Sequence, residues 1–149
     1  MSLLLDTNVI SELRKGPRAN PSVALWFEGV PEDEIHLSVL VVGELRRGIE
    51  RVRARDPRQA GALETWLRQV LRSHGERILP VDARVAEEWG RLTAMRSGSM
   101  IDTLMAATAQ VSGLTLVTRN VKDVAWTGVS YLNPFEVPAR TRPRTKRGR

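Results

Sequence analysis

The chain has 149 residues, the size of one domain, and its 42% hydrophobic and 27% charged residues are ordinary for a globular protein. It contains no cysteine, which excludes a disulfide scaffold, a zinc–thiolate site and a cysteine nucleophile. No apolar run approaches the roughly 18 residues of a membrane span, and Leu3-Leu4-Leu5 is too short for the core of a signal peptide. We therefore expect a cytoplasmic protein without a membrane span.

The net charge of +6 is concentrated at the C-terminus. Six of the 23 basic residues and no acidic residue follow Val137, which leaves 17 basic residues to balance the 17 acidic ones. These six are Arg140, Arg142, Arg144, Lys146, Arg147 and Arg149. We expect residues 1–137 to form the domain and residues 138–149 to be a basic, disordered tail. Such a tail would add sequence-independent affinity for RNA or serve only solubility.

Strand-like and helix-like patterns alternate along the chain. In chain order, we predict a strand at residues 2–5, helices at 9–14 and 21–29, a strand at 35–38, helices at 39–52 and 56–74, a strand at 78–81, helices at 83–96 and 99–112, and strands at 114–118 and 129–132. The helix after residue 38 has one apolar face, formed by Val42, Leu45, Ile49 and Val52.

This alternation predicts an α/β fold: a central, mainly parallel sheet of about five strands with helices on both faces. Sheets of this kind carry their sites just outside the carboxyl ends of the strands. Residues that follow the predicted strands are therefore the first candidates for function.

Acidic and amide side chains occur at these places. Asp6 follows the first strand directly, and Asn120 and Asp123 follow the strand at 114–118. Glu44 lies at the margin of the apolar face of its helix, and Asp102 lies in the first turn of an alanine-rich helix. All five side chains could meet at one edge of the sheet.

Two of these carboxylates also have a purely structural interpretation on their own helices. Ser99 and Asp102 have the spacing of a capping box, in which Asp102 only satisfies the start of the helix. Glu44 could pair with Arg47 or Arg51 on the solvent-facing side of its helix.

The other three have structural interpretations as well. Asn120 and Asp123 are ordinary turn residues. Asp6 is the hardest to explain in this way, because a desolvated carboxylate without a partner costs several kcal/mol. Thr7 and Asn8 could supply that partner by capping.

Three carboxylates gathered in one place would favour a bound cation. At about 5 Å and an effective dielectric constant of about 20, each pair repels by ~3 kcal/mol. Oxygen ligands without cysteine or a spaced pair of histidines select Mg²⁺ or Mn²⁺ over zinc. Such an ion lowers the pKa of bound water and neutralises charge on a phosphate, which is the chemistry of metal-dependent nucleases.

Seven short segments resemble those of PIN-domain ribonucleases, especially the VapC toxins of bacterial VapBC toxin–antitoxin pairs. They are LLDTNVISEL at 4–13, LS at 37–38, GELRRGI at 43–49, ILPVD at 78–82, IDTLMAATA at 101–109, GLTLVTRN at 113–120 and LNPF at 132–135. Their order and separation cover nearly all of the chain before the tail.

The resemblance implies a three-layer α/β/α sandwich with an acidic Mg²⁺ site that cleaves RNA. Asp6, Glu44 and Asp102 match the three principal acids of the family. The fourth position falls at Asn120, where some relatives have an acid, or is taken by Asp123 nearby. Val124 replaces the aromatic residue that often follows Asp123. Whether one or two metal ions take part stays open.

These observations give the hypothesis of a Mg²⁺-dependent endoribonuclease toxin. Its expected metal ligands are Asp6 and Asp102, with Glu44 binding the ion or positioning the attacking water. Further expected contributors are Asp123 and Asn120, which hold waters at the site, Thr7 and Thr118, which orient the carboxylates, and Arg119, which contacts RNA phosphates.

The resemblance also implies two protein partners: a second copy of the chain, and a small VapB-like antitoxin that blocks the acidic cleft, commonly with an arginine. Alternatives are a PIN-domain nuclease of RNA processing that is not a toxin, and an RNA-binding module without catalysis. An aspartyl-phosphate enzyme is a weaker alternative, because the second aspartate that it needs is replaced here by Asn8.

Overall fold

The computed structural model describes residues 1–136, so the predicted tail at 138–149 lies outside the described residues. Five strands form one sheet in which every neighbouring pair is parallel, in the order β3-β2-β1-β4-β5. The strands are β1 (Leu3–Leu5), β2 (Ile35–Ser38), β3 (Ile78–Leu79), β4 (Thr115–Val117) and β5 (Tyr131–Leu132). The α-helices of residues 1–136 are α1 (Thr7–Leu13), α2 (Pro21–Glu28), α3 (Val39–Arg53), α4 (Pro57–His74), α5 (Ala83–Met95), α6 (Met100–Ser112) and α7 (Val121–Val124).

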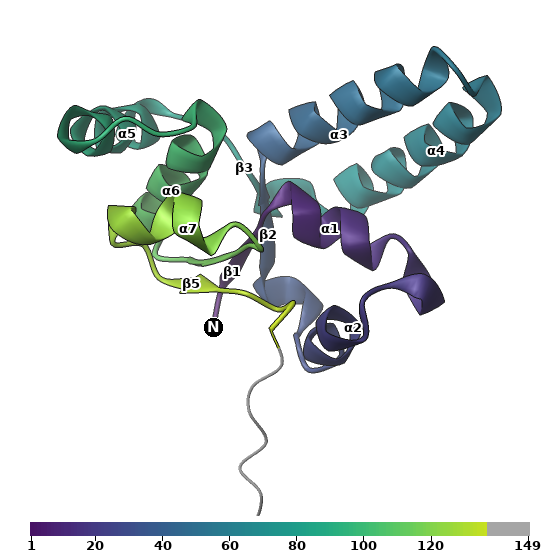
Figure 1. Cartoon of the computed structure of the whole chain (residues 1–149), viewed down its shortest axis with the longest axis horizontal. Helices are drawn as coiled ribbons and strands as arrows, with labels where there is room; N and C mark the ends of the chain where they lie inside the picture. The colour runs from purple at the N-terminus through teal and green to yellow at the C-terminus, as the bar shows by residue number, and fades with distance from the viewer. Residues whose placement is uncertain (137–149) are drawn as a thin grey trace, which may run out of the picture.

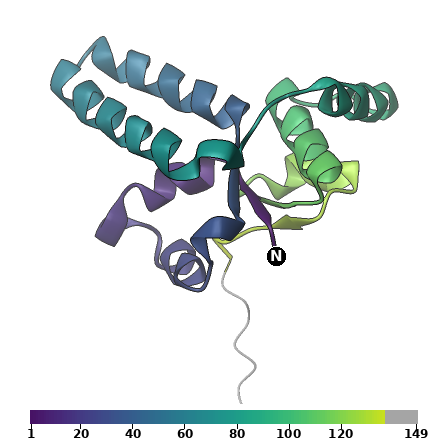
Figure 2. The ribbon, with the colours of Figure 1, turned by 180° about the vertical axis from the view of Figure 1, so that it is seen from behind.

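Helices cover both faces of this sheet. Helices α1 to α4 lie on one side and α5 to α7 on the other, as the two opposite views show (Figures 1 and 2). This confirms the predicted three-layer α/β/α architecture with its parallel sheet. Within residues 1–136, no helix combines the length and apolarity needed to cross a membrane.

The order of the strands creates a switch point beside β1. From β1 the chain moves outward through β2 to β3, and it then returns to β4, on the other side of β1, and moves outward to β5. The loops that follow β1 and β4 therefore diverge to opposite faces. In open α/β sheets, the crevice at such a point is where ligands bind.

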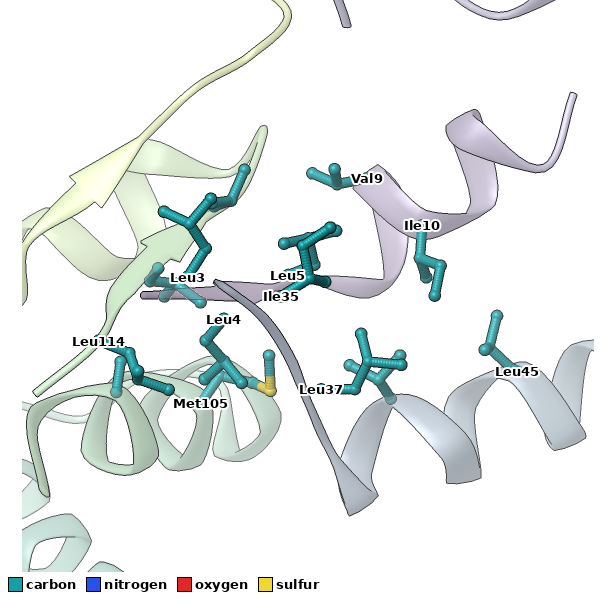
Figure 3. Close-up of a cluster of buried hydrophobic side chains, with 14 of the residues drawn as sticks. Leu3, Leu4, Leu5, Val9, Ile10, Ile35, Leu37, Leu45, Met105 and Leu114 are labelled. Atoms are coloured by element: carbon teal, nitrogen blue, oxygen red, sulfur yellow. The ribbon is translucent and has the colours of Figure 1, made fainter. Parts of the chain in front are cut away.

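The centre of the core is β1, whose three leucines are at most 2% exposed. Leu4 points toward Met105 of α6, while Leu5 points to the opposite face, where Val9 and Ile10 of α1 lie (Figure 3). Because successive side chains of a strand face opposite sides, a strand with helices on both faces must be apolar throughout. This packing fixes the strand directly before Asp6.

Strands β1 and β4 lose only terminal residues of their predicted ranges, whereas β3 and β5 are half as long as predicted. The strand predicted at 78–81 ends at Leu79, because Pro80 has no N–H to donate to the ladder. The strand predicted at 129–132 begins at Tyr131. It starts late because Gly128 makes a turn with φ +79° and the N–H of Val129 donates to the hydroxyl of Thr127.

The helices also differ in places from their prediction. Helix α1 begins at Thr7 rather than Val9, because Asp6 caps its start. On α3 the fully buried residue of the first turn is Val41 and not Val42. Residues after Asn120, predicted as a turn, form the short helix α7.

Candidate active site

An open pocket of about 480 Å³ lies at the carboxyl edge of the sheet. Its walls come from Asp6 and the start of α1, from α3, from the start of α6 and from the loop after β4. The lining residues are Asp6, Thr7, Asn8, Glu44, Arg47, Ser99, Ile101, Asp102 and Asn120. Three of the carboxylates singled out from the sequence, Asp6, Glu44 and Asp102, thus share one pocket.

Asp6 is the most buried of the three, at 8% exposure. Its Oδ1 accepts a hydrogen bond from the backbone N–H of Thr7 at 2.7 Å. Its Oδ2 accepts bonds from Asn8 Nδ2 at 3.1 Å and from Thr118 Oγ1 at 2.7 Å. The capping predicted for Thr7 and Asn8 is confirmed, and Thr118 adds a third donor from beneath the pocket.

Burial raises the pKa of Asp6, and the nearby Glu44 raises it further. The hydroxyl of Thr118 and the N–H of Thr7 act in the opposite direction, because hydrogen bonds to a carboxylate favour its charged form. The pKa remains above its ordinary value. This carboxylate is therefore held in place by donors that offset only part of its desolvation.

Glu44 reaches the pocket from the first half of α3. Its Oε1 accepts a hydrogen bond from Thr7 Oγ1 at 2.7 Å, and its Oε2 lies 3.5 Å from Arg47 Nη2. The pairing with Arg47 that the sequence suggested is therefore present. It coexists with a position in the pocket, so the structural and functional interpretations do not exclude each other.

At Asp102, the hydrogen bonds of residues 1–136 include only one half of the predicted capping box. The hydroxyl of Ser99 accepts a hydrogen bond from the backbone N–H of Asp102 at 3.5 Å, which caps α6, and the Asp102 carboxylate lines the pocket. Partial burial is the largest cause that raises the pKa of Asp102. The negative charge of Asp6 raises this pKa further, and the charges of Asp123 and Glu44 make smaller contributions in the same direction. The carboxylates are thus close enough to disfavour one another's ionisation.

Of the polar residues that follow β4, some lie at the pocket and others lie outside its lining. The buried Thr118 supports Asp6 and accepts a hydrogen bond from the N–H of Asn120 at 3.0 Å, which holds Asn120 at the pocket. Asp123 is exposed on α7 and is not a lining residue. Arg119 is also outside the lining; its backbone N–H donates to Asn8 Oδ1, and its guanidinium lies 4.8 Å from the centre of the Phe135 ring.

Sequence reasoning did not assign Arg47, Ser99 or Ile101 to a functional pocket. Arg47 was recognised only as a pairing partner, and Ser99 only as a helix cap. A signal was present for each: Arg47 follows Glu44 by one helical turn, and Ser99 and Ile101 flank the start of the helix that carries Asp102.

The chemistry of the pocket fits a hard divalent cation such as Mg²⁺ or Mn²⁺, because its acidic and amide donors are all oxygens. The side chains do not yet converge on one point: within residues 1–136, no three histidine, aspartate or glutamate side chains are placed to share an ion. Glu44 and Asp6 are directed instead to hydroxyl, amide and guanidinium donors.

A parallel sheet with an acidic pocket at its switch point is the kind of α/β domain that serves phosphodiester chemistry. Comparison with known families agrees with this class. Residues 3–122 match the family described as PIN domain, and the chain belongs to that family.

Several proteins are similar to this chain over nearly its whole length. Toxin FitB of Neisseria gonorrhoeae is 33% identical over 139 residues, which are 89% of this chain and 98% of that protein. VapC ribonuclease Y4jK of Sinorhizobium fredii is 33% identical over 141 residues, which are 90% of this chain and 98% of that protein.

Solved structures with the same fold include FitAcB from Neisseria gonorrhoeae, with a TM-score of 0.82 and 31% identity over 91% of this chain and 99% of that one. A toxin–antitoxin complex from Klebsiella pneumoniae has a TM-score of 0.69 and 26% identity, over 91% and 100% of the two chains. These similar proteins thus include a toxin named FitB, a VapC ribonuclease and a toxin–antitoxin complex.

Proposed function

We propose that this chain is a Mg²⁺-dependent endoribonuclease that acts in the cytoplasm as the toxin of a type II toxin–antitoxin system. The observation that carries the proposal is that Asp6, Glu44 and Asp102, from three distant segments, line one pocket. The names of its relatives, a VapC ribonuclease and Toxin FitB, support RNA as the substrate and toxicity as the outcome.

In this proposal Asp6 and Asp102 hold the metal ion, with Mn²⁺ as a substitute for Mg²⁺. Glu44 binds the ion or positions the attacking water. When bound, the ion activates that water and neutralises charge that develops on the phosphate. Asn120 holds a water at the pocket, and the exposed Asp123 acts on the site through its charge rather than by lining it.

Two threonines set the positions of the acids. Thr118 donates to Asp6 and Thr7 donates to Glu44, both at 2.7 Å, so each carboxylate presents a fixed oxygen. Arg119, exposed beside the pocket loop, contacts an RNA phosphate, and the basic residues after Val137 add further phosphate contacts.

The partners in this proposal are a second copy of the chain and a small antitoxin. The toxin–antitoxin complex from Klebsiella pneumoniae has the same fold, which supports an antitoxin partner. A cluster of partly buried carboxylates is a suitable receptor for a guanidinium group, so we propose that an arginine of the antitoxin enters the pocket.

The proposal is tested by removing the acids one at a time. Asp6→Asn and Asp102→Asn are each expected to reduce cleavage of a mixed RNA by more than about 100-fold and to abolish growth inhibition on expression. EDTA is expected to stop cleavage by the wild-type protein, and added Mg²⁺ to restore it. Cleavage is followed on denaturing gels, and retention of the fold is checked by circular dichroism.

Asp33→Asn is the matched control, because it removes one negative charge from an exposed turn that does not line the pocket. It is expected to cleave RNA as the wild type does. Full cleavage by folded Asp6→Asn or Asp102→Asn protein would refute the assignment, and cleavage in EDTA would refute the metal requirement.

A further inference from the structure

Arg47 is the only basic side chain among the described residues that line the acidic pocket. It lies on α3, one helical turn after Glu44, and its side chain is 58% exposed. Position and exposure together leave the guanidinium at the pocket and accessible to a ligand that enters from solvent.

The contact between Arg47 and Glu44 is loose. One nitrogen, Nη2, lies 3.5 Å from one carboxylate oxygen, whereas charge-assisted hydrogen bonds are about 2.7–2.9 Å long. Arg46 and Arg53 on the same helix hold Glu64 at 2.8 and 3.1 Å. A single long contact at an exposed site contributes little free energy, so Arg47 can exchange its partner at low cost.

The acids of the pocket oppose the entry of RNA unless a positive charge offsets them. Asp6, Glu44 and Asp102 present negative charge to an approaching phosphate and repel it. A guanidinium offers five N–H donors in a planar fork that matches two phosphate oxygens at once. Arg47 is the lining residue that can attract the RNA backbone into a pocket whose acids repel it.

We infer that Arg47 is an RNA phosphate-binding residue, whose guanidinium leaves Glu44 and pairs with a backbone phosphate when RNA enters the pocket. The inference rests on the proposed ribonuclease function and adds a binding subsite to it. The exchange also releases Oε2 of Glu44 into the pocket at the moment the substrate arrives. The entry of substrate is thereby linked to the position of a carboxylate on which the chemistry depends.

The test measures binding separately from cleavage. A short fluorescein-labelled single-stranded RNA of mixed sequence is titrated with Asp102→Asn protein in EDTA, at several salt concentrations, with and without Arg47→Ala. Arg47→Ala is expected to weaken binding about tenfold, the effect of losing one hydrogen bond between charged groups. The slope of log K against log salt should fall by about 0.7, the value for one phosphate contact on a single strand.

Arg68→Ala is the matched control. Arg68 is 63% exposed and has one contact with a carboxylate, 4.0 Å from Glu64, but it does not line the pocket. The Arg68→Ala substitution removes the same charge as Arg47→Ala, and it should leave both the RNA affinity and the salt slope unchanged. Arg47→Lys should keep the slope, because the charge remains, but bind more weakly than arginine because the planar fork is lost.

Equal affinity and slope for Arg47→Ala and Arg68→Ala would overturn the inference. So would a loss of cleavage in an otherwise wild-type Arg47→Ala protein with unchanged RNA binding, because Arg47 would then act only by positioning Glu44. Wild-type protein that neither binds nor cleaves RNA would overturn the proposed function as well. Cleavage by the wild type with no effect of Arg47 would overturn this inference alone.

Discussion

At the scale of single residues, the pocket carboxylates are costly for the fold. Asp6 is buried beside Glu44, and Asp102 faces both, so the pKa values of Asp6 and Asp102 lie above their ordinary range. A carboxyl with a raised pKa binds its proton more tightly in the folded than in the unfolded protein. Its contribution to stability is complete below the unfolded pKa and is lost as the pH rises through the folded pKa.

Asp102→Asn should therefore stabilise the protein at neutral pH. We expect the free energy of unfolding at pH 7 to rise by about 0.5–1 kcal/mol, a modest gain because Asp102 is only partly buried and water screens its repulsion. At about pH 3, below the ordinary aspartate pKa of about 3.9, the difference should vanish because the carboxyl is protonated in both states. Urea denaturation of both proteins in EDTA at the two pH values measures this difference in the free energy of unfolding.

Asp33→Asn serves as the comparison, since it removes a carboxylate that is exposed and does not line the pocket. We expect no gain of stability at pH 7 from this change. An Asp102→Asn protein less stable than the wild type at pH 7 would show that the favourable interaction of this carboxylate with the N-terminus of α6 outweighs its repulsion by Asp6.

At the scale of elements, the sequence predicts what depends on neighbouring residues. The apolar run before Asp6 predicts a buried strand, and the two residues after it are expected to satisfy its carboxylate; both predictions are confirmed. The helix itself begins two residues earlier than predicted, because Asp6 caps its start. The spacing of Ser99 and Asp102 predicts the start of α6. These features depend on residues that are neighbours in the chain, so they can be predicted from a single sequence.

What the sequence does not predict depends on distant partners. Strands β3 and β5 pair with β2 and β4 over two residues each, because Pro80 and the turn at Gly128 limit the pairing, and apolarity alone overestimates both lengths. Arg47 enters the pocket while Asp123 does not, because the rotation of α3 and the course of α7 decide which side chains face inward. Helical spacing places Arg47 beside Glu44, but it does not show that this pair faces the pocket or that Asp123 lies outside it.

The start of α6 is positioned by a close contact of Gly98. A Cβ atom at this residue would lie 3.1 Å from Thr103 Cγ2 and 3.2 Å from Trp126 Cζ2. Neither neighbour is free to move: Thr103 is fully buried and accepts a hydrogen bond from Trp89, and the Trp126 ring lies under the guanidinium of Arg96. The contact holds the segment that leads to Asp102.

Gly98→Ala should therefore destabilise the protein by about 1–2 kcal/mol, the cost of overpacking a tight site. It should also reduce RNA cleavage, because the strain displaces the segment that carries Ser99 and Asp102. Chemical denaturation and cleavage assays measure the two effects.

Gly90→Ala is the opposite case on the neighbouring helix α5, since a Cβ atom there has no heavy atom within 4 Å. This change should stabilise the protein by about 0.5–1 kcal/mol through helix propensity and leave cleavage intact. A Gly98→Ala protein as stable and active as the Gly90→Ala protein would show that the tight contact does not position the site.

At the scale of the whole molecule, charge is divided between two regions. Residues 1–137 carry equal numbers of acidic and basic residues, and three of the acids line the pocket, while the last twelve residues carry six basic groups and no acid. A neutral domain with an acidic pocket has little general attraction for RNA. The C-terminal segment supplies the net positive charge of the chain.

Removal of residues 138–149 should accordingly weaken RNA binding without destabilising the domain. Loss of six positive charges should lower the slope of log K against log salt by up to about 4, at about 0.7 for each phosphate contact on a single strand. The thermal midpoint should be unchanged. A full-length variant with the six basic residues replaced by glutamine separates charge from chain length, and it should behave like the truncated protein. Unchanged affinity and slope in both variants would instead assign the segment to solubility, and RNA would then depend for its attraction on Arg47 in the pocket and on Arg119 outside its lining.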